Sequence, residues 1–177
     1  MPSGRTHDAI TLMLAAPAAA VGYVSTGSLI SAILVGSAFV FGGMMFGPDL
    51  DTISRQYSRW WAFRFLWLPY RSFFKHRSRL SHGLIFGALI RVIYFLGILT
   101  LSAFVAVYLY SASASGTLPD IVEFTDAWRP VGSLIRNIFG DNFLVLIFTG
   151  LWFGAASHTF TDMAGSFVKT GRITKFL

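Results

Sequence analysis

The stretch HRSRLSH, residues 76–82, stands immediately before a long apolar segment of the chain. It contains two of the four histidines, His76 and His82, together with Ser81, a residue type that often begins a helix. The other two histidines and half of the acidic residues lie next to the ends of other apolar segments. Imidazole and carboxylate groups distributed in this way predict a metal site at one end of a small bundle of membrane helices.

The composition is that of an integral membrane protein. Of the 177 residues, 54% are hydrophobic and only 12% are charged, about half the charged share of a soluble domain. The mean hydropathy is +0.62, and several apolar segments approach the ~20 residues that a helix needs to cross a bilayer. We therefore expect one membrane domain, residues 1–177, whose first apolar segment is retained as an uncleaved span.

The absence of cysteine restricts the chemistry of any metal site. No disulfide or thiolate ligand is available, so a metal has to be held by imidazole and carboxylate. This ligand set favours a divalent ion, with Zn²⁺ first and Mn²⁺ or Fe²⁺ as alternatives, in one or two copies. The isoelectric point near 10.1 indicates membrane lipids rather than nucleic acid as a partner, because the basic residues lie between apolar segments and among tryptophans.

The order of apolar and polar segments predicts an all-α fold, a polytopic membrane protein with a four-span helical bundle. The glycine pairs Gly43/Gly47 and Gly150/Gly154 favour close packing of neighbouring helices. Arg91 lies within a span and is expected to reach the interface or to contact another helix. We expect spans at about 9–24, 29–46, 83–110 and 143–160, an interfacial aromatic-basic helical segment at 52–75, and an opposite-face loop at 111–142 that includes a short surface helix.

If the spans alternate in direction, all four histidines and four of the eight acids collect on one membrane face. Eleven of the fourteen Lys and Arg residues share that face, so the positive-inside rule places it in the cytoplasm. His158 and Asp162 are one helical turn apart, as two ligands of one ion often are. Asp49 and Asp51 follow a proline and would point the same way from extended backbone. The expected metal ligands are His7, Asp49, Asp51, His82, His158 and Asp162.

Four pieces of the sequence also resemble a known family. They are residues 4–8 (GRTHD), residues 48–51 (PDLD), residues 76–82, and the pair His158 and Asp162. Together they resemble a family of metal-binding membrane proteins found mainly in cyanobacteria, which looks like a branch of the membrane-bound metal-dependent hydrolases, including a LexA-binding inner-membrane hydrolase. The resemblance covers nearly the whole chain and implies a bacterial inner (plasma or thylakoid) membrane.

The sequence leaves three classes of function open. In the first, a metal-dependent hydrolase cleaves an amphiphilic phosphoester at the cytoplasmic headgroup level; His76 is a further ligand or a proton donor, and Arg77 holds the phosphate. In the second, the protein binds, stores or assembles around a metal without catalysis. The central motif of the hydrolases reads roughly His-Arg-Gly-x-Thr-His-Ser, and Ser78 stands in the place of its glycine, which favours this second class slightly. A transporter is disfavoured because only Arg91 is charged within a span. The sequence does not indicate which proteins, if any, bind to this one.

Overall fold

The computed structural model of the chain describes residues 3–74 and 83–171. Within these ranges every regular element is a helix and none is a β-strand, which confirms the predicted all-α class. The chain divides into two compact units. Unit 1 takes the described residues of 1–94 and 144–177, and unit 2 takes residues 95–143.

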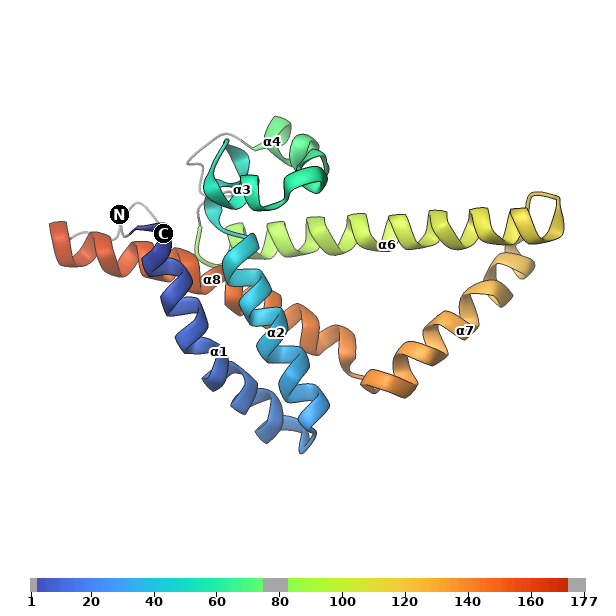
Figure 1. Cartoon of the computed structure of the whole chain (residues 1–177), viewed down its shortest axis with the longest axis horizontal. Helices are drawn as coiled ribbons and strands as arrows, with labels where there is room; N and C mark the ends of the chain where they lie inside the picture. Colours follow the sequence, from blue (N-terminus) through green and yellow to red (C-terminus); the bar gives the residue numbers. More distant parts are fainter. Residues whose placement is uncertain (1–2, 75–82, 172–177) are drawn as a thin grey trace. The chain divides into compact units, whose positions relative to one another are not determined.

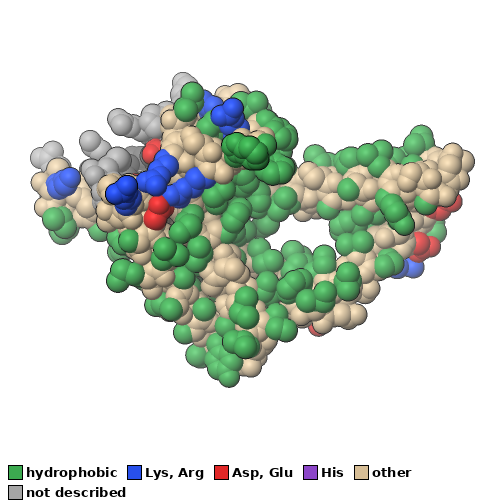
Figure 2. Space-filling view, viewed as in Figure 1, with side chains coloured by type: hydrophobic (Ala, Val, Ile, Leu, Met, Phe, Trp, Pro, Cys, Tyr) green, Lys and Arg blue, Asp and Glu red, His purple; other side chains and the backbone are tan. Residues whose placement is uncertain are grey.

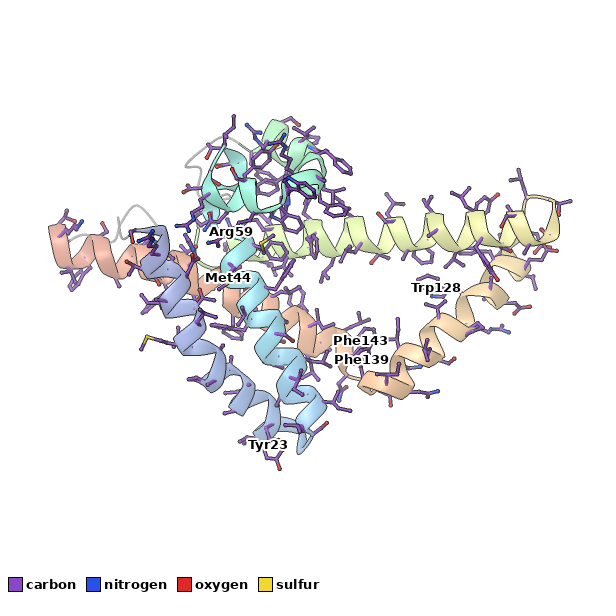
Figure 3. The ribbon with its side chains drawn as sticks, viewed as in Figure 1. Tyr23, Met44, Arg59, Trp128, Phe139 and Phe143 are labelled. Carbon is purple, nitrogen blue, oxygen red and sulfur yellow. The ribbon has the colours of Figure 1, made fainter. Side chains whose placement is uncertain are left out.

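In unit 1 the helices α1 (Gly4–Thr26) and α2 (Leu29–Met45) lie side by side as an antiparallel hairpin (Figure 1). α1 ends because Gly27 adopts the left-handed conformation, with φ 68°, that glycine tolerates without strain. The N–H of Gly27 donates to the carbonyl of Tyr23 at 2.7 Å, at the closed end of the hairpin (Figure 3). Ser28 then caps α2. The start of α1 and the end of α2 therefore meet at the same end of unit 1.

Helix α8 (Phe143–Thr170) approaches the backbone of α2 closely at two of its glycines. A Cβ atom placed on Gly154 would clash with the carbonyl oxygen of Phe39 and lie 2.9 Å from the nitrogen of Gly43. A Cβ on Gly150 would lie 2.8 Å from another carbonyl of α2. The close helix approach predicted at Gly150 and Gly154 is therefore confirmed, and it sets the position of the C-terminal half of α8.

Among the residues that the structure describes, three helices are long and apolar enough to cross a membrane: α1, α6 (Phe86–Ser115) and α8. They suggest a membrane protein. α2 has 17 residues, which give it a length of about 26 Å, short of the ~30 Å hydrocarbon core of a bilayer. The second of the four predicted spans, at 29–46, is thus not clearly a span, because Gly47 and Pro48 end the helix at Met45.

Between α2 and α6, the described residues 48–74 form a compact aromatic segment. Trp60, Trp67 and Tyr70 are buried, and the ring centroids of Trp60 and Trp67 lie 5.2 Å apart. Other rings face outward, since Trp61 is 81% exposed and Phe73 is 83% exposed. Its location in the headgroup layer stays a prediction. The helices of this segment are η1 (Pro48–Asp51), α3 (Arg55–Arg59), η2 (Trp61–Trp67) and α4 (Leu68–Phe73).

A buried arginine attaches this aromatic segment to the first turns of α6. Arg91 is fully buried, and its electrostatic partners include the hydroxyl of Tyr70 and the carboxylate of Asp51. Burial raises the pKa of Tyr70, so that the phenol meets the guanidinium as a neutral dipole. The hydroxyl of Tyr94 donates to the carbonyl of Leu66 nearby. Of the two roles expected for Arg91, the structure shows the contact with another helix.

Unit 2 contains the remainder of α6 and the helix α7 (Ile121–Phe139). α7 begins with a capping box: the N–H of Glu123 donates to the carboxylate of Asp120 at 2.8 Å, and the N–H of Asp120 donates to the carboxylate of Glu123 at 3.1 Å. The rings of Phe104 and Trp128 stack at 4.8 Å, and Trp128 points from α7 toward α6 (Figure 3). The expected surface helix is therefore present in the stretch between α6 and α8.

Candidate metal centre

The first ligand candidate lies at the beginning of α1. Ser3 caps this helix, because its side-chain oxygen accepts a hydrogen bond from the N–H of Thr6 at 3.3 Å. The cap holds His7 in the second turn, where it is only 5% exposed. Nδ1 of His7 is buried and finds no hydrogen-bond partner within the described residues.

The other two candidates lie on α8, one turn apart. Oδ1 of Asp162 is 3.1 Å from Nε2 of His7, and Oδ2 of Asp162 is 3.9 Å from Nε2 of His158. The two imidazole rings stack with centroids 3.9 Å apart and an interplanar angle of 14°. All three side chains are buried, and each offers a donor atom within 4.8 Å of the others. We call these three residues the histidine–aspartate group.

This group fits a divalent cation. Two ligands of a tetrahedral Zn²⁺ with bonds of about 2.0–2.1 Å stand about 3.3 Å apart, close to the 3.1 Å between His7 and Asp162. Two positively charged rings stacked at 3.9 Å would repel each other, so at least one imidazole is favoured in the neutral form that binds metals. His7, His158 and Asp162 could therefore form a metal site, while its metal stays undetermined.

The group lies in the wall of a cavity of about 220 Å³, the polar cavity. Charged side chains gather on the surface at this end of unit 1, where α1 begins and α3 lies (Figure 2). Arg59 is paired on the wall: it donates to the carboxylate of Asp8 at 2.6 Å and to the carbonyl of Met44 at 2.8 Å (Figure 3). The polar cavity is lined by Gly4, His7, Asp8, Asp49, Ser54, Arg55, Gln56, Arg59, His158 and Asp162.

A glutamine of α3 supports one of the histidines. The amide nitrogen of Gln56 lies 3.0 Å from both ring nitrogens of His158, and Gln56 is itself buried. This approach requires Gly47, because a Cβ atom there would overlap the amide of Gln56. The turn that ends α2 thus also places an amide against His158. With a metal on one ring nitrogen, the amide oxygen of Gln56 would accept from the N–H of the other ring nitrogen and so orient the ligand.

Comparison with protein families supports metal binding. Residues 2–172 match the family described as "Uncharacterized metal-binding protein (DUF2227)". The chain belongs to this family. The family's description agrees with the histidine–aspartate group, which supplies imidazole and carboxylate donors without sulfur. No curated protein and no solved structure matches the chain.

Some of the predicted metal ligands lie together in the structure, and others do not. His7, His158 and Asp162 form the group, and Asp49 lines the same cavity. Asp51 is buried with Arg91 among its electrostatic partners and does not line the cavity. The two aspartates diverge because Pro48 starts a 3₁₀ turn instead of the expected extended backbone. The remaining predicted residues, His76, Arg77 and His82, lie outside the described residues.

Sequence reasoning missed four residues of the polar cavity: Ser54, Arg55, Gln56 and Arg59. They belong to the aromatic-basic segment, whose composition favoured a membrane-surface role. The signal that could have located them is Gly47 followed by Pro48, which ends α2 beside the predicted ligands and turns the next helix back over them. Asp8 was left without a role, and the structure gives it one as the partner of Arg59.

Proposed function

We propose that this protein is a membrane-embedded, metal-dependent hydrolase that cleaves a phosphoester at the level of the lipid headgroups. The observation that carries the proposal is the histidine–aspartate group in the wall of a polar cavity. Catalytic zinc sites use three protein ligands and keep a further position for water or substrate, whereas structural sites are closed by four. Three donors beside a cavity correspond to the catalytic arrangement.

The residues of the cavity have complementary roles in this proposal. His7, His158 and Asp162 would hold the metal, which when bound supplies a water of lowered pKa and a Lewis acid for a phosphoryl oxygen. Gln56 orients the ring of His158, and the ion pair of Asp8 with Arg59 fixes α3 against α1. The sequence-based roles of His76 and Arg77 remain part of the proposal.

The substrate class follows from where the cavity lies along the helices. It opens where α1 begins and α2 ends, next to the aromatic-basic segment. The ends of membrane-spanning helices lie near the lipid headgroups. An amphiphilic, phosphate-bearing molecule of the membrane suits this location. Because basic residues are concentrated at this end, we place the site on the cytoplasmic face of a bacterial inner membrane.

Hydrolysis can be tested with purified, zinc-loaded protein and a panel of phosphatidic acid, phosphatidylglycerol phosphate and prenyl phosphates. We expect release of phosphate or headgroup that EDTA abolishes and that His158→Ala reduces at least 100-fold. Lys169→Gln, an exposed change on the same helix, serves as the matched control and should keep full activity. If the zinc-loaded protein is inert on the whole panel, hydrolysis is refuted.

A second candidate function, metal binding without catalysis, is favoured by Asp49. Its carboxylate lines the same cavity and could complete a closed, four-ligand site that stores the metal or joins the helix ends. The variant Asp49→Asn separates the two. If Asp49 is a ligand, the zinc affinity falls at least tenfold; if the site is open, zinc stays bound.

A further inference from the structure

Within the part of the chain that the structure describes, one basic residue of the polar cavity has no partner for its charge. Arg55 is exposed at the surface and also lines the cavity, so it stands at the cavity mouth. Its guanidinium makes no hydrogen bond or ion pair with the described residues. The guanidinium lies over the first turn of α1, since a Cβ on Gly4 would be 3.2 Å from its nitrogen. Arg59, by contrast, is engaged by Asp8.

The charge balance of the lining changes sign when a metal binds. Among the described residues, the cavity wall carries three carboxylates, of Asp8, Asp49 and Asp162, and two guanidiniums, of Arg55 and Arg59. With neutral histidines the net charge of the wall is minus one, which favours uptake of a cation. A divalent ion in the histidine–aspartate group makes the net charge plus one, and the unpaired positive group is Arg55 at the mouth.

We propose that Arg55 binds a phosphate oxyanion in the polar cavity. This inference rests on the proposed function and adds a second phosphate-binding group, at the cavity mouth, to the role proposed for Arg77. A guanidinium presents parallel N–H donors that match two oxygens of a phosphate. A tetrahedral phosphate can offer those two oxygens to Arg55 and a third to the metal, which a planar carboxylate cannot do.

The size of the cavity restricts what enters it. At about 220 Å³ it is smaller than the ~300 Å³ at which pockets for drug-sized molecules begin. The cavity therefore accepts a phosphate group or a small headgroup, not the body of a lipid. The shared chemistry of the ligand is the phosphate, which can come from a lipid headgroup or from free phosphate.

The test measures phosphate binding rather than turnover. Inorganic phosphate is titrated calorimetrically into zinc-loaded wild type, Arg55→Gln, Arg55→Lys and Arg64→Gln, each first checked for zinc content and thermal stability. Arg64 is an exposed arginine outside the polar cavity, so its variant is the matched control. We expect phosphate affinity to fall at least tenfold in Arg55→Gln, less in Arg55→Lys, and not at all in Arg64→Gln.

A second titration with dihexanoyl phosphatidic acid identifies the source of the phosphate. Tighter binding than inorganic phosphate, lost in Arg55→Gln, supports a lipid headgroup; weaker binding with the same dependence on Arg55 supports free phosphate. Equal phosphate affinity in wild type and Arg55→Gln, or no binding to zinc-loaded wild type, overturns the inference while leaving metal binding intact. Failure of wild type to bind zinc overturns the proposed function instead.

Discussion

Replacing Gly154 with alanine tests how the helix packing holds the metal site. The new methyl group would meet the carbonyl of Phe39 and the backbone nitrogen of Gly43, neither of which can rotate away. Overpacking of this kind costs about 1–3 kcal/mol, and the better helix propensity of alanine offsets up to about 1 kcal/mol of it. Because the clash is with backbone atoms, the upper part of that range, about 2–3 kcal/mol, applies, and the net expected loss is about 1–2 kcal/mol. Because His158 lies one turn further along α8, zinc binding should weaken too.

The assay is thermal unfolding of the detergent-solubilised protein with and without zinc. At about 2–4 °C per kcal/mol for a chain of this length, we expect the Tm of Gly154→Ala to fall by roughly 2–8 °C. The matched control is Gly97→Ala, since a Cβ on Gly97 meets nothing within 4 Å; its Tm should stay the same or rise. A Gly154→Ala protein as stable as Gly97→Ala, with unchanged zinc affinity, would refute the close-packing account.

Two further predictions concern buried polar groups. Gln56→Ala removes the hydrogen-bond partner of His158 and should weaken zinc binding about 10–100-fold, as loss of such supporting groups does. The zinc affinity is measured by competition titration with a zinc chelator. Ser58→Ala, an exposed change on the same helix, is the control and should keep the wild-type zinc affinity. Arg91→Met removes a fully buried guanidinium whose electrostatic partners are Tyr70 first and the carboxylate of Asp51 next, and should lower the free energy of unfolding by about 3–5 kcal/mol, as the loss of one member of a buried polar group does. If Arg91→Met and wild type have the same free energy of unfolding in chemical denaturation, the buried guanidinium contributes nothing to stability.

The sequence predicted the helices better than the connections between them. Long apolar segments identify α1, α6 and α8 because a helix is the structure that satisfies all its backbone groups within a bilayer. The helix α2 illustrates the limit. Gly47 and Pro48 predict where it ends, and the structure agrees within one residue, but its 17 residues leave it short of a span.

The candidate site was predictable where its ligands share a regular helix. His158 and Asp162 are one turn apart on α8, a spacing that periodicity reveals, and His7 follows from antiparallel packing of α1. Gln56 and Arg55 could not be found from helical spacing, because they lie on a different helix. Their positions depend on the turn at Gly47 and on the 3₁₀ geometry after Pro48; the dipeptide marks the turn in the sequence, but the direction of the chain after it is visible only in the structure.

The most direct measurement of the central claim is the metal content of the purified protein, by elemental analysis of wild type beside His158→Ala. Asp141→Asn, an acid of unit 2 outside the histidine–aspartate group, serves as the control for loss of a carboxylate. We predict at least one divalent ion per chain in wild type and in the control, and a loss of most of it in His158→Ala. Equal metal content in all three proteins would contradict the assignment of the site.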